Sequence, residues 1–339
     1  MKFLNFIGID MSRNWFDAHL LKSESSSRGV HEQFSNDKKG FRAFKKWLSK
    51  NKVNSLKQSL ICMEHTGVYT VPLCRYLNSI KAIYTLIAGY EIKYSSGTRR
   101  GKTDKVDAKR IARYAFEKQD VIRMYDLPSP AIRSLRTLLS LRSRLMKATH
   151  AFKVSNQELQ KFEKLEVMTV LDKASKSVIE SIDNQQIEVK SAIKQLLKAH
   201  PSMQHNYELL LTVPGIGEII ALYLIVQTQN FVSFRKSRKF ATFCGIAPFE
   251  ESSGEDQALS AHVSHLANKK MKALLTNGAY SAIQHYPEFK AYFEKQIKKG
   301  KKEFSVINAI KNKMIHRAFA VINRGTKYMD NFAYKPAGL

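Results

Sequence analysis

The chain has 339 residues, of which 44% are hydrophobic, and its 56 Lys and Arg against 29 Asp and Glu give a formal net charge of +27. This length and apolar content exclude a disordered tail and allow two domains, each with a core of its own. The charge favours a polyanionic partner, most simply nucleic acid held through its phosphates, and no apolar run approaches the roughly 18 residues that a membrane-spanning helix needs.

The N-terminal third predicts a mixed sheet with helices. An apolar run ends on Asp10, a polar turn follows, and a second apolar run completes the pattern of a β-hairpin. Further on, SLICME is typical of a buried strand and ends on Glu64. The expected elements, in chain order, are strands over residues 3–9, 15–21 and 30–34, a helix over 38–49, a strand over 59–64, a helix over 71–80 and a strand over 82–88.

Residues 97–115 read GTRRGKTDKVDAKRIARYA and combine seven basic side chains with two acids. Apolar residues recur at helical intervals after Thr103, which predicts a helix with Thr103 as its N-cap. The spacing of Asp104 and Asp107 places both carboxylates on one face of the first helical turn. Taken alone, the pair is also explained as two solvated acids that favour a helix N-terminus.

The order strand, strand, strand, helix, strand, helix, strand, helix is that of a ribonuclease H-like domain, in which the first and fourth strands are neighbours. Asp10, Glu64, Asp104 and Asp107 would then converge at one edge of the sheet. Close carboxylates repel one another unless cations lie among them, and Mg²⁺ or Mn²⁺ prefers such oxygen ligands. Two such ions can clamp the attacking and leaving oxygens of a phosphodiester. Taken singly, Asp10 is also explained as a strand-end cap and Glu64 as a structural carboxylate.

Pro128 and Pro130 mark a change of composition. Residues 131–166 contain no Gly or Pro and predict one long helix, whose arginine-rich side could follow a phosphate backbone. A second helix carries a heptad seam with one polar position, formed by Ile179, Ile182, Gln186, Val189, Ile193 and Leu196. The two helices predict a helical hairpin or coiled coil that serves as a spacer or an oligomerisation element.

The last third begins with two apolar helices joined by a glycine turn, LLTVPGIGEIIALYLI at residues 209–224. Such a helix-hairpin-helix-like turn can direct backbone N–H groups at a phosphate, or it can simply join two packed helices. A basic stretch, FRKSRKF, follows at residues 234–240, and Ser252 and Ser253 then lie in what composition predicts to be a polar loop. The lysines at residues 295–302 predict a mobile basic loop.

Cysteine usage and the N-terminus both indicate a cytoplasmic protein. Cys62, Cys74 and Cys244 lack the spacing of a zinc site or a disulfide framework and are expected to be reduced, mostly buried thiols. The start, MKFLNFIGID, lacks the long apolar stretch and cleavage site of a signal peptide. We therefore expect a cytoplasmic protein that is associated with the nucleoid when it is bound to DNA.

Five stretches together resemble the DEDD transposases of insertion-sequence family 110, relatives of the Piv invertase that are also called bridge recombinases. They are GID at 8–10, EHTGVY at 64–69, GTRRGKTDKVDAKRIA at 97–112, VPGIG at 213–217 and FRKSRKFATFCGIAPFEESSG at 234–254. The resemblance covers nearly the whole chain and implies an α/β plus α fold. Its domains would be a RuvC-like (RNase H-like) DEDD catalytic domain over 1–127, a coiled coil over 128–200, and a mostly α-helical transposase domain over 201–339.

The resemblance also implies a catalytic mechanism. The four acids of the family map onto Asp10, Glu64, Asp104 and Asp107, the expected ligands of Mg²⁺ or Mn²⁺, and its serine, which directly precedes a glycine, maps onto Ser253. Ser253 would attack DNA and form a covalent phosphoserine, which preserves the energy of the broken bond for strand exchange. Ser252 is the alternative nucleophile. Composition alone makes either serine an ordinary turn residue.

Family members act on donor and target DNA, work as homo-oligomers and are guided by a structured bridge RNA. The resemblance implies the same partners here, with a dimer or a tetramer as the expected assembly. The predicted nucleic-acid contacts are Arg99, Arg100, Lys102, Lys105, Gly215, Gly217, Arg235, Arg238, Lys269 and Lys270. Many relatives carry a basic ISKRGN stretch after the SSG motif, whereas this chain reads VSHLAN at 263–268. Lys269, Lys270 and Lys272 would supply that phosphate contact instead. Glu255 also places an acid beside the expected nucleophile.

Three other functions compete with a DNA transposase or recombinase. A RuvC-like DNA endonuclease that cuts with a metal-activated water explains the acids but leaves the C-terminal region without a role. A sugar kinase or actin-like ATPase shares the GIDMS pattern at residues 8–12 but needs a later glycine-rich phosphate loop, which the sequence lacks. A non-enzymatic nucleic-acid scaffold would bind without cleaving. The sequence favours the transposase.

Overall fold

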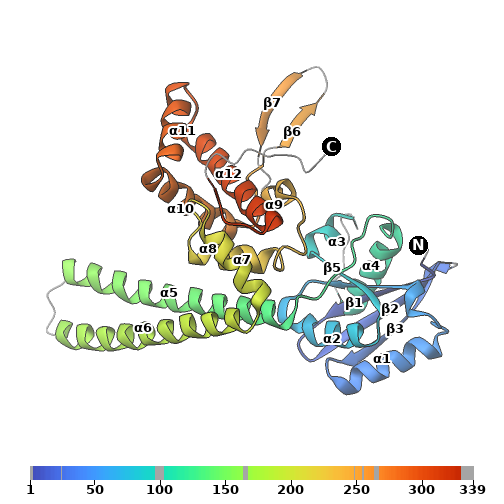
Figure 1. Cartoon of the computed structure of the whole chain (residues 1–339). Helices are drawn as coiled ribbons and strands as arrows, with labels where there is room; N and C mark the ends of the chain where they lie inside the picture. The colour runs from blue at the N-terminus through green and yellow to red at the C-terminus, as the bar shows by residue number, and fades with distance from the viewer. Residues whose placement is uncertain are drawn as a thin grey trace. The chain divides into compact units, whose positions relative to one another are not determined.

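The chain folds into two compact units, Met1–Leu127 and Pro128–Leu339, called unit 1 and unit 2 below (Figure 1). The structure, a computed structural model, describes residues 3–23, 25–95, 103–162, 167–247, 249–253, 256–262 and 267–329. Within these ranges no helix is both long enough and apolar enough to cross a membrane. The finer division of residues 128–339 into a coiled coil and a transposase domain stays a prediction.

Unit 1 is a five-stranded mixed sheet with helices on both faces (Figure 1). Its strands are β1 (Asn5–Met11), β2 (Trp15–Lys22), β3 (Ser25–Ser35), β4 (Ser59–Glu64) and β5 (Ile83–Ile87). Its α-helices are α1 (Lys38–Lys50), α2 (Val71–Ser79), α3 (Gly89–Ser95) and α4 (Asp104–Glu117). The strands lie in the order β3-β2-β1-β4-β5; β2 is antiparallel to β1 and β3, and β4 is parallel to β1 and β5.

The strands and helices predicted for this part of the chain are all present. The hairpin, the strand that ends on Glu64 and the helix that begins after Thr103 are confirmed. The sequence does not predict α3 or the two 3₁₀ helices, Leu56–Gln58 and Gly67–Thr70. Each of these elements is too short to show a recognisable hydrophobic period.

The two faces of the sheet bury different side chains, because successive residues of a strand point to opposite sides. One face packs against α1 and α2 around an aromatic cluster of Phe16, Phe34, Phe41, Phe44 and Trp47. The other face packs against α3 and α4 through Phe6, Leu21, Leu60, Cys62, Ile92, Ile111, Ala112 and Ala115. The second face is apolar towards one end of the strands only. At the other end β1 and β4 present acids on it.

Unit 2 is mainly helical. Its elements are α5 (Pro130–Phe162), α6 (Met168–Lys198), α7 (Pro201–Leu211), α8 (Glu218–Gln227), α9 (Ser237–Phe243), β6 (Phe249–Ser253), β7 (Asp256–His262), α10 (Lys269–His285), α11 (Pro287–Lys298) and α12 (Glu303–Arg324). The long helices α5 and α6 pack along each other (Figure 1). The predicted seam residues of α6 all lie on its less exposed side. The coiled coil stays a prediction. Residues 163–166, the predicted end of the first helix, lie outside the described residues.

The glycine turn between α7 and α8 is held by close packing. Gly215 has φ +82°, and a methyl group on it would lie 2.8 Å from the carbonyl oxygen of Gly278 in α10. A methyl group on Gly278 would in turn lie 2.5 Å from the carbonyl oxygen of Gly215. Two glycines therefore let this turn touch α10, within the core that joins α5 and α6 to the C-terminal helices.

Two segments of unit 2 differ from their predicted structure. The prediction of a mobile basic loop over residues 295–302 is wrong, because α11 continues to Lys298, α12 begins at Glu303, and Gly300 with φ +78° forms a short turn between them. Buried Val306, Ile307 and Ile310 hold the start of α12. Ser252 and Ser253 lie in β6 and not in a loop, because β6 pairs with β7 in an antiparallel hairpin.

Candidate active site

The four predicted acids of unit 1 line one cleft. The cleft has a volume of about 220 Å³ and is lined by Asp10, Met11, Ser12, Asp17, Glu64, Asp104 and Asp107. Its acids come from β1, β2, β4 and the first turn of α4. Residues that are far apart in the sequence are thus brought to one end of the sheet.

The register of the sheet brings Asp10 and Glu64 together. β1 and β4 are parallel neighbours, as predicted, and Ile9 pairs with Met63. Asp10 and Glu64 are the next residue of each strand, so they lie side by side and point to the same face. This is the face that α4 covers.

Gly8 lets α4 lie directly on β1. A methyl group on Gly8 would lie 2.1 Å from the backbone nitrogen of Ala112 and 2.2 Å from the carbonyl oxygen of Ala108. Asp104 lies one turn before Ala108 on the same side of α4, and Asp10 lies two residues after Gly8 on the same side of β1. The close contact between helix and strand therefore fixes the first turn of α4 at the cleft.

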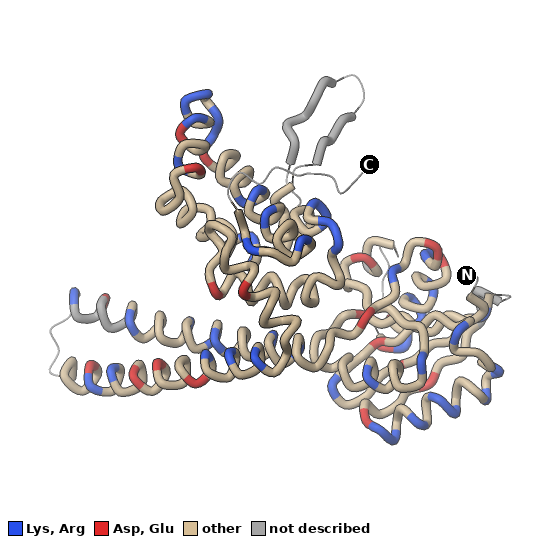
Figure 2. Tube along the Cα trace, viewed as in Figure 1, with Lys and Arg blue, Asp and Glu red and all other residues tan. Residues whose placement is uncertain are grey.

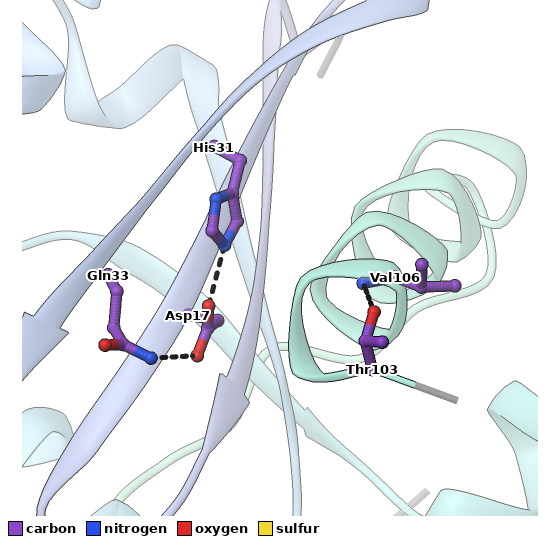
Figure 3. A network of polar contacts seen from close by, with 5 residues as sticks. All are labelled: Asp17, His31, Gln33, Thr103 and Val106. Carbon is purple, nitrogen blue, oxygen red and sulfur yellow. Dashed lines mark hydrogen bonds and ion pairs between the residues drawn. The ribbon is translucent and has the colours of Figure 1, made fainter. Parts of the chain in front are cut away.

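The N-cap fixes where α4 begins. The Thr103 hydroxyl oxygen accepts a hydrogen bond of 3.3 Å from the backbone N–H of Val106, which confirms the predicted cap (Figure 3). Asp104 and Asp107 then both fall in the first turn, where unpaired N–H groups favour negative charge. Arg110 donates to Asp107 Oδ1 at 2.7 Å and orients that carboxylate.

Gly89 leaves room for the carboxylate of Glu64. A methyl group on Gly89, the first residue of α3, would lie 2.3 Å from Glu64 Oε1. The backbone also ties the two strand ends together, because the N–H of His65 donates to the carbonyl oxygen of Ile87 at 2.9 Å. Any side chain at residue 89 would displace the Glu64 carboxylate.

Sequence reasoning does not single out the fifth carboxylate of the cleft, Asp17. It faces Asp10 across the β1–β2 pair, and its side chain is only 5% exposed. Asp17 Oδ1 accepts a hydrogen bond from His31 Nε2 at 2.7 Å, and Oδ2 accepts one from Gln33 Nε2 at 3.0 Å (Figure 3). The predicted hairpin contains the clue to Asp17, because a turn centred between residues 13 and 14 pairs residue 10 with residue 17.

Burial and crowding of the acids change the pKa of Asp10. Burial, followed by the charges of Asp104, Asp107, Glu64 and Asp17, raises the pKa of Asp10 from an ordinary 3.8 to about 6. His19 on β2 does not supply a positive charge that would offset these carboxylates at neutral pH, because burial, followed by nearby cations, lowers the pKa of its imidazole to about 4. The cleft therefore favours a cation taken up from solution.

The oxygen donors of the cleft suit a hard divalent cation such as Mg²⁺ or Mn²⁺. Among the described side chains, no group of three or more His, Cys, Asp or Glu is already arranged as a metal site. Mg²⁺ retains several waters and is usually held by one or two carboxylates together with substrate phosphates. An open cleft lined by acids fits this mode of binding.

The predicted nucleic-acid contacts are distributed over both units. Lys105 is exposed on α4. Arg235 is exposed just before α9 and Arg238 within it, and Lys269 and Lys270 are exposed in the first turn of α10. Lys and Arg also occur along α5 and at the junction of α11 with α12 (Figure 2).

The remaining predicted site residues include the two glycines of the α7–α8 turn and the two serines. Gly217 is exposed at the N-cap of α8, whereas Gly215 packs against Gly278. Ser253 is the last residue of β6, and Ser252 precedes it. Residues 254, 255 and 263–266, together with Arg99, Arg100 and Lys102, lie outside the described residues. The roles of these residues stay predictions.

Two family models match the chain. Residues 7–161 match a model for DEDD transposases of the IS110 type, and residues 207–294 match a model described as transposase of the IS116/IS110/IS902 family. The chain belongs to the IS110 family of transposases. The first match contains all four predicted acids, and the second contains Ser252 and Ser253.

The transposase is also similar to individual proteins. The pilin gene-inverting protein of Moraxella bovis is 26% identical over 326 residues, which cover 95% of this chain and 97% of that protein. An insertion element IS110 protein of Streptomyces coelicolor is 26% identical over 166 residues, 48% of this chain and 38% of that protein. The transposase for insertion sequence element IS1111A of Coxiella burnetii is 28% identical over 89 residues, 26% of this chain and 24% of that protein.

Proposed function

We propose that this transposase cleaves and exchanges DNA strands with the assistance of divalent cations held by Asp10, Glu64, Asp104 and Asp107. The observation that carries the proposal is the single cleft that these four side chains line. The strand order β3-β2-β1-β4-β5, with β4 and β5 parallel to β1, supports an RNase H or RuvC-like fold for unit 1. Relatives that are named for gene inversion and for transposition support DNA as the substrate.

The four acids would hold Mg²⁺ or Mn²⁺ through their carboxylate oxygens. When bound, such ions polarise the phosphodiester and stabilise charge that develops on its oxygens. Burial, followed by repulsion from the neighbouring acids, raises the pKa of Asp10. A cation between the carboxylates relieves this repulsion, which supports the role. Gly8 and the Thr103 cap keep the acids of α4 at the cleft.

Strand exchange requires that the energy of the cleaved bond be kept, and we infer that Ser253 does this, with Ser252 as the alternative. The serine Oγ would attack the phosphorus of a phosphodiester, the bond from phosphorus to the leaving strand would break, and the leaving oxygen would take up the proton that the serine loses. A hydroxyl group of another strand would then attack the phosphoserine and restore the serine. The SSG sequence at residues 252–254 and the transposase match over residues 207–294 support this step.

The family resemblance supports two further partners. A structured bridge RNA would pair with donor and target DNA, and a homo-oligomer, a dimer or a tetramer, would let the acids of one subunit act with the serine of another. The net charge of +27 supports extensive contact with nucleic acid. Sequencing the RNA that copurifies with the protein, with and without ribonuclease treatment, tests the first partner, and light scattering tests the second.

Strand cleavage by single variants tests the function. Asp104→Asn is expected to abolish cleavage, and Ser253→Ala to abolish both the covalent protein–DNA adduct, read on denaturing gels, and strand transfer. Asp37→Asn is the control, because Asp37 caps α1 and does not line the cleft. Cleavage by Asp104→Asn would refute the site. Cleavage by Ser253→Ala without transfer would favour the second candidate, a RuvC-like endonuclease that uses water.

A further inference from the structure

Asp17 lies at the cleft but has no role in the proposed reaction. It lines the cleft together with the four acids and faces Asp10 in register. Its side chain is 5% exposed. A carboxylate buried to this extent is normally paired or hydrogen-bonded, because removing an ionised group from water is strongly unfavourable.

The hydrogen bonds to Asp17 come from the neighbouring strand. Gln33 pairs with Asp17 across β2 and β3, and His31 lies two residues before Gln33 on the same face. Gln33 Nε2 donates to Oδ2 at 3.0 Å, and His31 Nε2 lies 2.7 Å from Oδ1 (Figure 3). All three residues belong to regular strands, so the sheet itself fixes the orientation of the carboxylate.

This arrangement suits a residue that acts on a cation through water. Each oxygen of Asp17 already accepts one hydrogen bond from the protein and retains further acceptor capacity. Mg²⁺ retains several waters, and groups that hydrogen-bond to metal-bound water or to ligands orient them and strengthen binding. The negative charge of Asp17 also adds to the attraction for a cation.

We propose that Asp17, fixed by His31 and Gln33, is a positioning residue that strengthens the binding of a divalent cation in the cleft without being a direct ligand. The inference rests on the proposed function, because it requires the four acids to hold a cation. The competing explanation is that Asp17 only ties β2 to β3.

The binding of Mn²⁺ to the full-length chain separates the two explanations. Free Mn²⁺ is measured by electron paramagnetic resonance, without DNA. Asp17→Asn keeps the shape of the side chain and is expected to raise the Kd for Mn²⁺ by about 10- to 100-fold while the number of ions bound per chain stays the same. A structural tie would lower the melting temperature without weakening Mn²⁺ binding.

Asp37→Asn is the matched control. It removes one carboxylate charge from the same unit and disturbs two hydrogen bonds, from the backbone N–H of Gly40 at 2.7 Å and from the hydroxyl of Ser35 at 2.9 Å. Asp37 does not line the cleft, so this variant is expected to melt earlier and to bind Mn²⁺ like the wild type. If Asp17→Asn also binds Mn²⁺ like the wild type, the inference is overturned.

Two further variants keep the inference testable if Asp17→Asn does not fold. His31→Gln and Gln33→Leu leave Asp17 in place but weaken its orientation, and each is expected to raise the Kd for Mn²⁺ by up to about tenfold. Unchanged Kd values in both would overturn the inference. A wild type that binds no Mn²⁺ would instead refute the proposed metal site itself, and the positioning role with it.

Discussion

A methyl group on Gly8 would lie 2.1 Å from the backbone nitrogen of Ala112, so β1 and α4 meet backbone to backbone. Side chains that are displaced by a new methyl group can rotate away, but here the obstacle is the main chain of a helix. The position of the acids on α4 therefore depends on a residue that carries no chemistry of its own.

Gly8→Ala is expected to lower the free energy of unfolding by about 2 kcal/mol or more and to reduce strand cleavage, because α4 must move away from β1. Urea unfolding followed by circular dichroism measures the change. Gly217→Ala is the control: its methyl group enters open space at the N-cap of α8, and the expected loss is about 1 kcal/mol or less. Equal losses in the two variants would contradict the contact between helix and strand.

Asp10→Asn is expected to stabilise the metal-free chain while it abolishes cleavage. At pH 7 the wild-type carboxylate is ionised, although its partial burial, followed by the charges of the neighbouring acids, raises its pKa to about 6. Removing that charge should raise the free energy of unfolding by about 1 to 2 kcal/mol, less than the full pKa shift implies, because solvent screens the half-exposed carboxylate. Thermal and urea unfolding in the presence of EDTA measure this, and a less stable Asn variant would show that Asp10 is not crowded.

The stability of the metal-free chain is expected to depend on pH through Asp10. The folded chain holds this proton more tightly than the unfolded chain, so the contribution of Asp10 is most favourable below about pH 4, falls as the pH rises towards 6, and is constant above. The stability of the Asp10→Asn variant should lack this part of the dependence on pH. Mn²⁺ affinity should change in the opposite direction and weaken below pH 6, because the cation competes with the proton. If the free energy of unfolding depended on pH in the same way in the wild type and in Asp10→Asn, the raised pKa of Asp10 would be contradicted.

Salt-dependent binding of DNA tests the predicted contacts in unit 2. Replacing Arg235, Arg238, Lys269 and Lys270 by Gln is expected to reduce the slope of log K against log salt by up to about 0.9 for each phosphate contact that is lost. The control replaces four exposed lysines of α1, Lys38, Lys39, Lys45 and Lys46, and so changes the net charge by the same amount. A similar slope in the two variants would mean that overall charge, and not these residues, determines binding.

Local signals explain why most of unit 1 could be predicted. The polar turn after Asp10, the apolar run before Glu64 and the cap at Thr103 each specify a structure within a few residues. The approach of α4 to Gly8 and the hydrogen bonds of Asp17 depend instead on segments that are separated in the sequence, so local sequence signals do not predict them.

Composition alone predicts the wrong secondary structure for two polar segments of unit 2. The lysines around Gly300 suggested a loop, but residues 306, 307 and 310 form the buried side of α12 immediately afterwards. Lysine is compatible with a helix, so a run of charges alone does not end one. For Ser252 and Ser253, polar composition indicated a turn, whereas pairing with β7 makes these residues part of a strand.

The three cysteines offer a practical route to site-specific labels. All of them lie in the described part of the chain, where they are free and buried. Burial raises the pKa of Cys74 and of Cys244 to about 12 and raises that of Cys62 as well, so few thiolates are present at neutral pH. A cysteine introduced at exposed Ser181 on α6 would therefore react with a maleimide dye far faster than the native thiols, and a fluorophore could be attached without replacing any of them.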